Sequence, residues 1–140
     1  MGLVIGLLAV FGIVLSSLPA PAQTSGPLVI QIDIDHVVHP LTAEIVADGV
    51  EQAEARGAAA ILIRLNTPGG LLSATEEIIQ IMLGSEVPIV TYVAPSGGKA
   101  ASAGFMILVA GDVAAMAPGT NTGAAHPVML GGGEMDPILK

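Results

Sequence analysis

The chain has 140 residues, enough for one domain, and 52% of them are hydrophobic while only 2% are aromatic. Its formal net charge of -8 repels phosphate backbones, and so few aromatic rings leave no stacking platform for bases, so the composition argues against nucleic-acid binding. Because cysteine is absent, disulfides, thiol nucleophiles and thiolate metal sites are excluded.

An apolar segment without charge opens the chain and has the form of a secretory signal. Its apolar run covers residues 3–15, and Ala20-Pro21-Ala22 supplies small residues at the positions that a signal peptidase reads. We therefore predict a signal peptide over residues 1–22 and an exported, membrane-associated protein on the periplasmic or extracellular face. No Lys or Arg precedes the apolar run, so retention of this segment as an anchor is the alternative to cleavage.

From residue 27 onward, apolar runs alternate with helical patterns. Residues 28–34 predict a strand, and Pro40 and Thr42 mark the start of a helix that continues through residues 43–56. A second strand over residues 58–66 follows. The inner side of the predicted helix carries Ile45, Val46, Val50 and Ala53.

The second half repeats this alternation. A helix over residues 74–83 is predicted, with Ser73 and Glu76 as its capping box and with Ile78, Ile79 and Leu83 facing inward. The elements expected next are a strand over 87–94, a loop over 95–99, a helix over 100–110, a strand over 113–118 and a loop from Gly119 onward.

Strands alternating with helices predict an α/β fold of stacked βαβ units around a mostly parallel sheet. The strands read as almost continuous apolar runs, so we expect helices on both faces of the sheet. One domain would cover residues 27–140. Because "MDPILK" resembles the beginning of a helix without a partner, we expect this domain to be C-terminally incomplete.

Two glycine-rich segments follow predicted strands and would meet at the carboxyl edge of the sheet, where ligands gather in parallel folds. They are "NTPGG" and "PSGGKAAS". Ser102 lies in the first turn of its predicted helix, so it could attack a carbonyl, while the amides of Gly69, Gly70 and Ala103 could hold the resulting oxyanion. The alternative is that Ser102 serves only tight packing or helix capping.

A serine nucleophile needs a base, and the sequence offers few. His126 lies in a loop, Lys140 is the last residue, and Lys99 is three positions from Ser102. A lysine acts as a base only if its surroundings lower its pKa. His36 and His39 have no carboxylates at a convincing metal-ligand spacing, so we expect no metal and no cofactor.

Four motifs in this order, "NTPGG", "PSGGKAASAG", "AMAPGTNTGAAHP" and "GGGEMD", resemble the N-terminal protease domain of the NfeD family (nodulation efficiency protein D). These are membrane-associated serine proteases related to the Clp protease proteolytic subunit and to signal peptide peptidase A. The resemblance runs from about residue 27 to the end and implies a Clp/crotonase-like fold. It also implies that Ser102 is the nucleophile and that Gly69, Gly70 and Ala103 form the oxyanion hole.

The resemblance further implies a lysine base soon after the "GGGEMD" loop, which Lys140 matches; a lysine a few residues further on is the alternative. His126 falls near the place of the catalytic histidine in the Clp relatives, so a Ser-His pair stays open. The family implies apolar substrate segments of stomatin-like membrane partners, added as an extra strand, and a homodimer.

Two functions follow from these observations. The first is an exported serine endopeptidase with a Ser-Lys dyad. The second is a non-catalytic membrane scaffold with the same fold, which binds a stomatin-like partner. Acyl-CoA chemistry of the crotonase type is disfavoured, because the protein is predicted to be exported and no basic cluster awaits a nucleotide phosphate.

Overall fold

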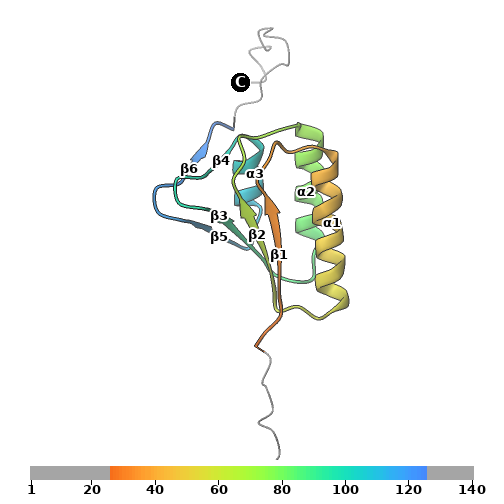
Figure 1. Ribbon diagram of the computed structural model, residues 1–140. Coiled ribbons are helices and arrows are strands. Elements are labelled where there is room, and N and C mark those ends of the chain that lie inside the picture. The colour runs from red at the N-terminus through yellow and green to blue at the C-terminus, as the bar shows by residue number, and fades with distance from the viewer. Residues whose placement is uncertain (1–25, 126–140) are drawn as a thin grey trace, which may run out of the picture.

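A computed structural model describes residues 26–125 of the chain (Figure 1). The predicted signal peptide lies outside these residues. The elements, in chain order, are β1 (Val29–Ile34), α1 (Pro40–Ala55), β2 (Ala60–Leu65), α2 (Leu72–Gly84), β3 (Ile89–Val93), β4 (Lys99–Ala101), α3 (Ala103–Val109), β5 (Val113–Met116) and β6 (Asn121–Gly123).

A four-stranded parallel sheet in the order β1-β2-β3-β5 forms the centre of the fold. Its strands are in register across the sheet, with Ile30 beside Ile61 and Ile61 beside Ile89. Helices α1 and α2 connect β1 to β2 and β2 to β3, while β4 and α3 lie between β3 and β5. The predicted alternation and the parallel sheet are therefore confirmed.

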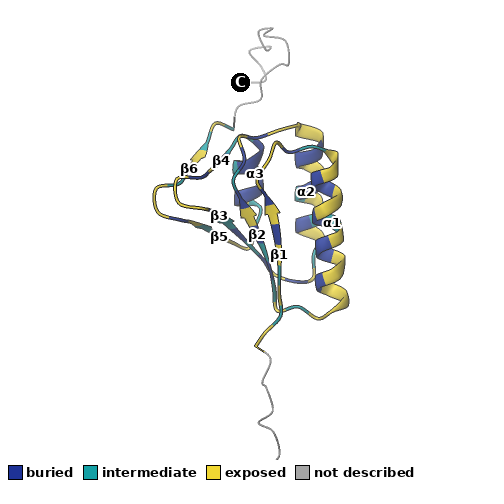
Figure 2. Cartoon of the chain, in the orientation of Figure 1, coloured by how far each residue is buried: buried dark blue, intermediate teal, exposed yellow. Residues whose placement is uncertain are grey.

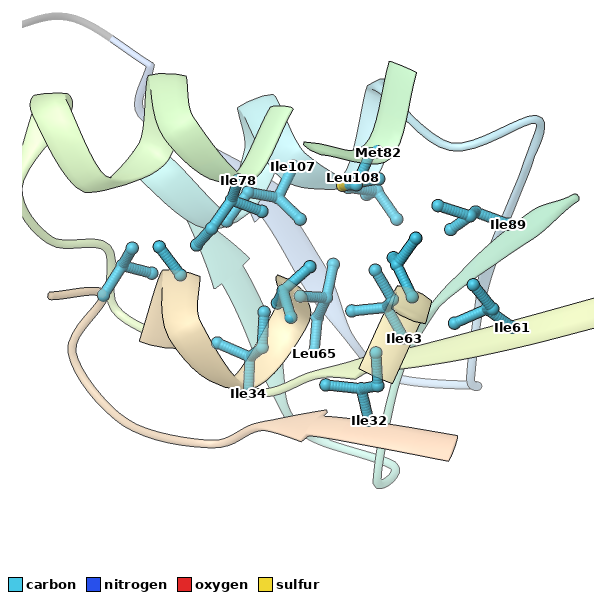
Figure 3. Packing of buried hydrophobic residues seen from close by; sticks show 14 of the residues in the cluster. Ile32, Ile34, Ile61, Ile63, Leu65, Ile78, Met82, Ile89, Ile107 and Leu108 are labelled. Carbon is cyan, nitrogen blue, oxygen red and sulfur yellow. The ribbon is translucent and has the colours of Figure 1, made fainter. Parts of the chain in front are cut away.

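The hydrophobic core lies between one face of this sheet and the three helices. The inward residues of β2 and β3 include Ile61, Ile63 and Leu65, none of which is exposed, and Ile89, which is 1% exposed. Figure 3 shows Ile78 and Met82 of α2 and Ile107 and Leu108 of α3 packed above these strands. Figure 2 shows the same division on α1 and α2, whose exposed residues lie away from the sheet.

The opposite face of the sheet is different from the one we expected. Gln31, Asp33 and Arg64 are exposed there, and Arg64 Nε lies 2.9 Å from Asp33 Oδ1. Within residues 26–125, helices therefore cover one face of the sheet, and the prediction of helices on both faces is wrong. In "VIQIDI" the polar residues Gln31 and Asp33 are spaced by two, and Arg64 of the next strand lies beside Asp33, which is the pattern of a sheet with one open face.

Two of the residues predicted to face inward on helices are exposed instead, namely Ile45 (48%) and Leu83 (73%). The capping prediction for α2 is also wrong, because the helix begins at Leu72 and Leu71 is its N-cap, which places Ser73 inside the first turn. Thr75 takes the role of a local polar partner, since its hydroxyl donates to the carbonyl of Leu71 at 2.8 Å.

The predicted helix over residues 100–110 is divided between two elements, since β4 occupies its beginning and α3 starts only at Ala103. Strand β4 pairs in parallel with β6, and β6 lies in the segment from Gly119 onward that was predicted to be a loop. Ala100 also forms a bridge with Thr67. Lysine and alanine have no strong preference for strands, so these tertiary partners, rather than local propensity, decide the extended conformation of β4.

Candidate active site

Ser102 connects β4 to α3 and has an unusual backbone. It is the N-cap of α3, with φ 54° and ψ -116°, whereas the sequence placed it inside the first turn. Residues other than glycine rarely adopt positive φ, and such strain costs about 1–3 kcal/mol and concentrates at functional sites. The Ser102 amide donates to the carbonyl of Gly123 at 2.7 Å, and its own carbonyl accepts from Phe105 at 3.0 Å. The strained backbone is therefore fixed by hydrogen bonds on both sides.

The turn after β2 lies against this serine. A Cβ atom added to Gly69 would be 2.8 Å from Ser102 Cβ and 3.3 Å from Ser102 Oγ. Gly69 has φ +121°, which an L side chain rarely adopts. Both the backbone conformation and the close approach thus require glycine here, and the structure brings together the two segments that the sequence predicted to meet.

Gly70 allows the same turn to pack against the segment after β1. A Cβ atom on Gly70 would overlap the backbone of Val38. The Val38 amide donates to the Gly69 carbonyl at 2.8 Å, and the Leu71 amide donates to the Val38 carbonyl at 2.9 Å. Because these bonds flank Gly70, its own amide and carbonyl point to the other side of the turn.

The three amides predicted to form an oxyanion hole are not equivalent. The Gly69 amide already donates to Thr67 Oγ1 at 3.1 Å. No hydrogen bond among the described residues uses the Gly70 amide. Ala103 is the first residue of α3, where an amide has no partner inside the helix. Within residues 26–125, the other two amides, those of Gly70 and Ala103, have no acceptor and could donate to a ligand.

Hydrogen bonds also connect the end of β2 to the strand that leads to Ser102. The Thr67 amide donates to the carbonyl of Lys99 at 2.7 Å, and the amide of Ala101 donates to the Thr67 carbonyl at 3.1 Å. Asn66 Oδ1 accepts from the Lys99 amide at 3.2 Å. As Figure 1 shows, β4 and α3 consequently lie beside the carboxyl end of β2.

The small residues around Ser102 have a packing role that the sequence did not reveal. Ala100 and Ala103 are buried, at 0% and 1% exposure. A Cβ atom on Gly104 would be 2.6 Å from Thr67 Cγ2. These residues let β4 and the first turn of α3 pack tightly on Thr67. The glycine beside the Ser102 hydroxyl is Gly69.

The predicted bases are placed as follows. Lys140 and His126 both lie outside the described residues. Lys99 is exposed on β4, and His36 pairs with Asp35 on the surface, with Nδ1 and Oδ1 2.8 Å apart. In residues 26–125, no three His, Asp or Glu side chains gather as metal ligands.

Sequence reasoning missed two contributors to this site. Thr67 is completely buried beneath the turn, and Gly123 holds the Ser102 amide. The signal for Thr67 was a hydroxyl residue between a strand end and "PGG". Gly123 gave no local signal, because its role depends on the pairing of β6 with β4.

Two curated relatives resemble this chain in sequence. The membrane-bound protease PH1510 of Pyrococcus horikoshii is 46% identical over 77 residues, which are 55% of this chain and 18% of the relative. The membrane protein NfeD1b of Bacillus subtilis is 30% identical over 119 residues, which are 85% of this chain and 26% of the relative. The chain thus spans only a small part of the length of either relative.

Solved structures show the same fold. The 1510-N membrane-bound stomatin-specific protease, as a lysine-to-alanine mutant with a substrate peptide, matches with a TM-score of 0.75 and 35% identity, over 81% of this chain and 54% of that one. A serine-to-alanine mutant of 1510-N matches equally well, at 0.75 and 33%, over 82% of this chain and 58% of that one. ClpP1 of Listeria monocytogenes, as an asparagine-to-aspartate mutant, matches at 0.60 and 22%, over 65% of this chain and 53% of that one.

These structural matches confirm the Clp/crotonase-like α/β fold. Among the described residues, no helix has the length and apolar character needed to cross a membrane. The family model for the NfeD1b N-terminal domain matches residues 28–137, most of the chain. The protein therefore belongs to the NfeD1b N-terminal domain family.

Proposed function

We propose that this chain is a serine endopeptidase domain in which Ser102 is the nucleophile. The observation that carries the proposal is the strained backbone of Ser102 in direct contact with Gly69. Strain of this kind persists only where the surrounding structure enforces it, and a serine needed only for packing or capping would not require it. Relatives with the same fold include a membrane-bound protease and a stomatin-specific protease.

In the proposed reaction, Ser102 Oγ attacks the carbonyl carbon of a peptide bond while its proton passes to a base. The carbonyl oxygen becomes negatively charged and accepts hydrogen bonds from the amides of Gly70 and Ala103. Gly69 contributes by its small size, since its amide is already bonded to Thr67. The protonated base then gives its proton to the leaving amine, and water hydrolyses the acyl-enzyme.

We propose Lys140 as the base, with His126 or a later lysine as the alternatives. A lysine base is supported by the 1510-N structures, which include both a lysine-to-alanine and a serine-to-alanine mutant. A basic side chain beside Ser102 must be neutral to accept the proton, so its pKa must lie near the working pH.

The proposed substrate is an apolar segment of a stomatin-like membrane protein, bound in an extended conformation. This is supported by 1510-N, which is stomatin-specific and was solved with a substrate peptide. Residence at a membrane is supported by the relatives, which are membrane-bound or membrane proteins. Export, cleavage of residues 1–22 and a homodimer stay predictions.

A non-catalytic scaffold is the second candidate, and one comparison favours it. NfeD1b of Bacillus subtilis, which matches 85% of this chain, is a membrane protein. Such a scaffold would bind its stomatin-like partner equally well with or without the Ser102 hydroxyl.

The test compares the full-length protein with its Ser102→Ala variant on peptides from apolar segments of stomatin-like proteins. We expect cleavage and labelling by a fluorophosphonate probe to be lost in the variant, while its melting temperature is retained. Ser96→Ala is the matched control, because Ser96 is exposed in the connection before β4.

Replacing Lys140 and His126 separately by alanine identifies the base. Equal cleavage by the parent and Ser102→Ala would overturn the proposal, and unaltered partner binding without cleavage by either would favour the scaffold.

A further inference from the structure

We infer that Thr67 is a positioning residue for the oxyanion turn, an inference that rests on the proposed peptidase function. Its hydroxyl would hold Gly69 in place so that the neighbouring Gly70 amide faces the tetrahedral oxygen. Thr67 itself would touch neither substrate nor oxyanion.

The side chain of Thr67 joins two segments that are distant in sequence. It is completely buried, and its Oγ1 donates to the carbonyl of His36 at 2.5 Å. The same oxygen accepts from the Gly69 amide at 3.1 Å and lies 3.2 Å from the Gly69 carbonyl. A threonine hydroxyl has one proton and two lone pairs, so it can donate to His36 and accept from Gly69 at once.

Thr67 is joined by backbone hydrogen bonds to strand β4, which precedes Ser102. Its amide and carbonyl bond to Lys99 and Ala101, the first and last residues of β4, which leads directly into Ser102. Its methyl group lies where a side chain on Gly104 would be, at the start of α3. One residue therefore fixes both the glycine turn and the segment that carries Ser102, and so sets the distance between them.

The other completely buried threonines of the described chain have a different role. The hydroxyls of Thr75 and Thr91 donate to the carbonyls of Leu71 and Leu108, at 2.8 and 2.7 Å, and each thereby stabilises the packing of a helix. Neither accepts a hydrogen bond from the glycine turn. Thr91 is therefore a matched control for the loss of a buried hydroxyl.

Removal of the Thr67 hydroxyl would release the Gly69 amide and the His36 carbonyl together. Within the part of the chain that the structure describes, the turn would then be held through the bonds between Val38 and the residues flanking Gly70. Because an oxyanion donor stabilises charge that develops in the transition state, a displaced Gly70 amide should lower kcat more than it raises KM.

The experiment compares Thr67→Val, Thr67→Ser and Thr91→Val in the full-length protein. Thr67→Val should lower kcat for peptide cleavage about 10- to 100-fold with little change in KM, since loss of a whole oxyanion donor costs 10²–10³. Thr67→Ser keeps the hydroxyl and should restore kcat to within a few fold of the parent. Thr91→Val should lower the melting temperature about as much as Thr67→Val while leaving kcat unchanged.

A second readout separates positioning from a general loss of structure. A peptide boronic acid forms a tetrahedral adduct with the serine, and its affinity should fall in Thr67→Val by the same factor as kcat. The affinity of the matching uncleaved peptide, measured in the Ser102→Ala background, should not change. Hydrogen exchange on the unsubstituted protein adds a measurement that needs no variant: the Gly69 amide should exchange more slowly than the Gly70 amide.

Equal kcat for Thr67→Val and Thr67→Ser, or fast exchange at Gly69, would overturn the inference while leaving the peptidase proposal intact. A parent protein that neither cleaves peptides nor reacts with the fluorophosphonate would instead overturn the proposed function. The two failures are thus distinguishable by the behaviour of the parent.

Discussion

The inner face of the sheet and the segment around Ser102 follow opposite rules. On the sheet, isoleucine and leucine occupy every second position of β2, and local preference, burial and register all agree. Around Ser102, alanines form a short strand, a serine adopts a positive φ, and glycines replace side chains at each close approach. The first region therefore provides stability, and the second region consumes part of it to hold one geometry.

The largest effect expected from this comparison belongs to Gly69→Ala. The added methyl group would overlap Ser102 Cβ at 2.8 Å, and φ +121° would be strained. We expect cleavage to fall by at least about 100-fold, since displacement of reacting groups by an ångström has such consequences.

The matched control for this change is Gly84→Ala at the end of α2, where an added Cβ meets nothing within 4 Å and no positive φ applies. It should leave cleavage unchanged and stabilise the fold slightly. Equal cleavage by Gly69→Ala and the parent would contradict the contact between the turn and the serine.

Ile63→Ala should have the next largest effect, on stability alone. Ile63 is completely buried in β2, and truncation of such a residue costs about 2–5 kcal/mol of the free energy of unfolding. Cleavage per folded molecule should stay close to that of the parent, which chemical denaturation combined with active-site titration can measure. If kcat fell under conditions where all molecules are folded, the inner face of the sheet would also influence the geometry around Ser102.

Ser102→Gly should have the smallest effect on stability, and it should be more stable than Ser102→Ala although glycine usually destabilises a folded chain. Glycine adopts φ 54° without penalty, so relief of about 1–3 kcal/mol of strain is partly offset by about 1 kcal/mol of added chain entropy. We therefore expect Ser102→Gly to be more stable than Ser102→Ala by about 1 kcal/mol, with both variants inactive. Thermal unfolding of the pair measures the difference, and a less stable glycine variant would argue against strain at this position.

The extent to which the fold could be predicted follows the same division. Strands β1 to β3 and helices α1 and α2 were predictable because apolar periodicity determines them. The polar residues Gln31, Asp33 and Arg64 indicate the open face of the sheet. The apolar residues around them make each strand resemble one that is buried on both faces. Ile45 and Leu83 show that a hydrophobic residue on a helix need not face the core.

The proximity of Ser102 and the glycine turn was predictable from the sequence, and their geometry was not. Ser102 and the glycine turn could be named from strand ends and from a family resemblance. The division of residues 100–110 into β4 and α3 depends on contacts with Thr67 and with β6, which no local pattern encodes. The engagement of the Gly69 amide by Thr67 likewise depends on a single buried hydroxyl.

The bond between the Ser102 amide and the Gly123 carbonyl has a consequence for how the protein is made. The serine receives this support from a strand that the ribosome adds only after α3 and β5 are complete. A growing chain that ends before β6 therefore lacks the hydrogen bond that fixes the backbone of Ser102. The proposed hydrolytic activity would then arise only late in synthesis, once β6 is paired with β4.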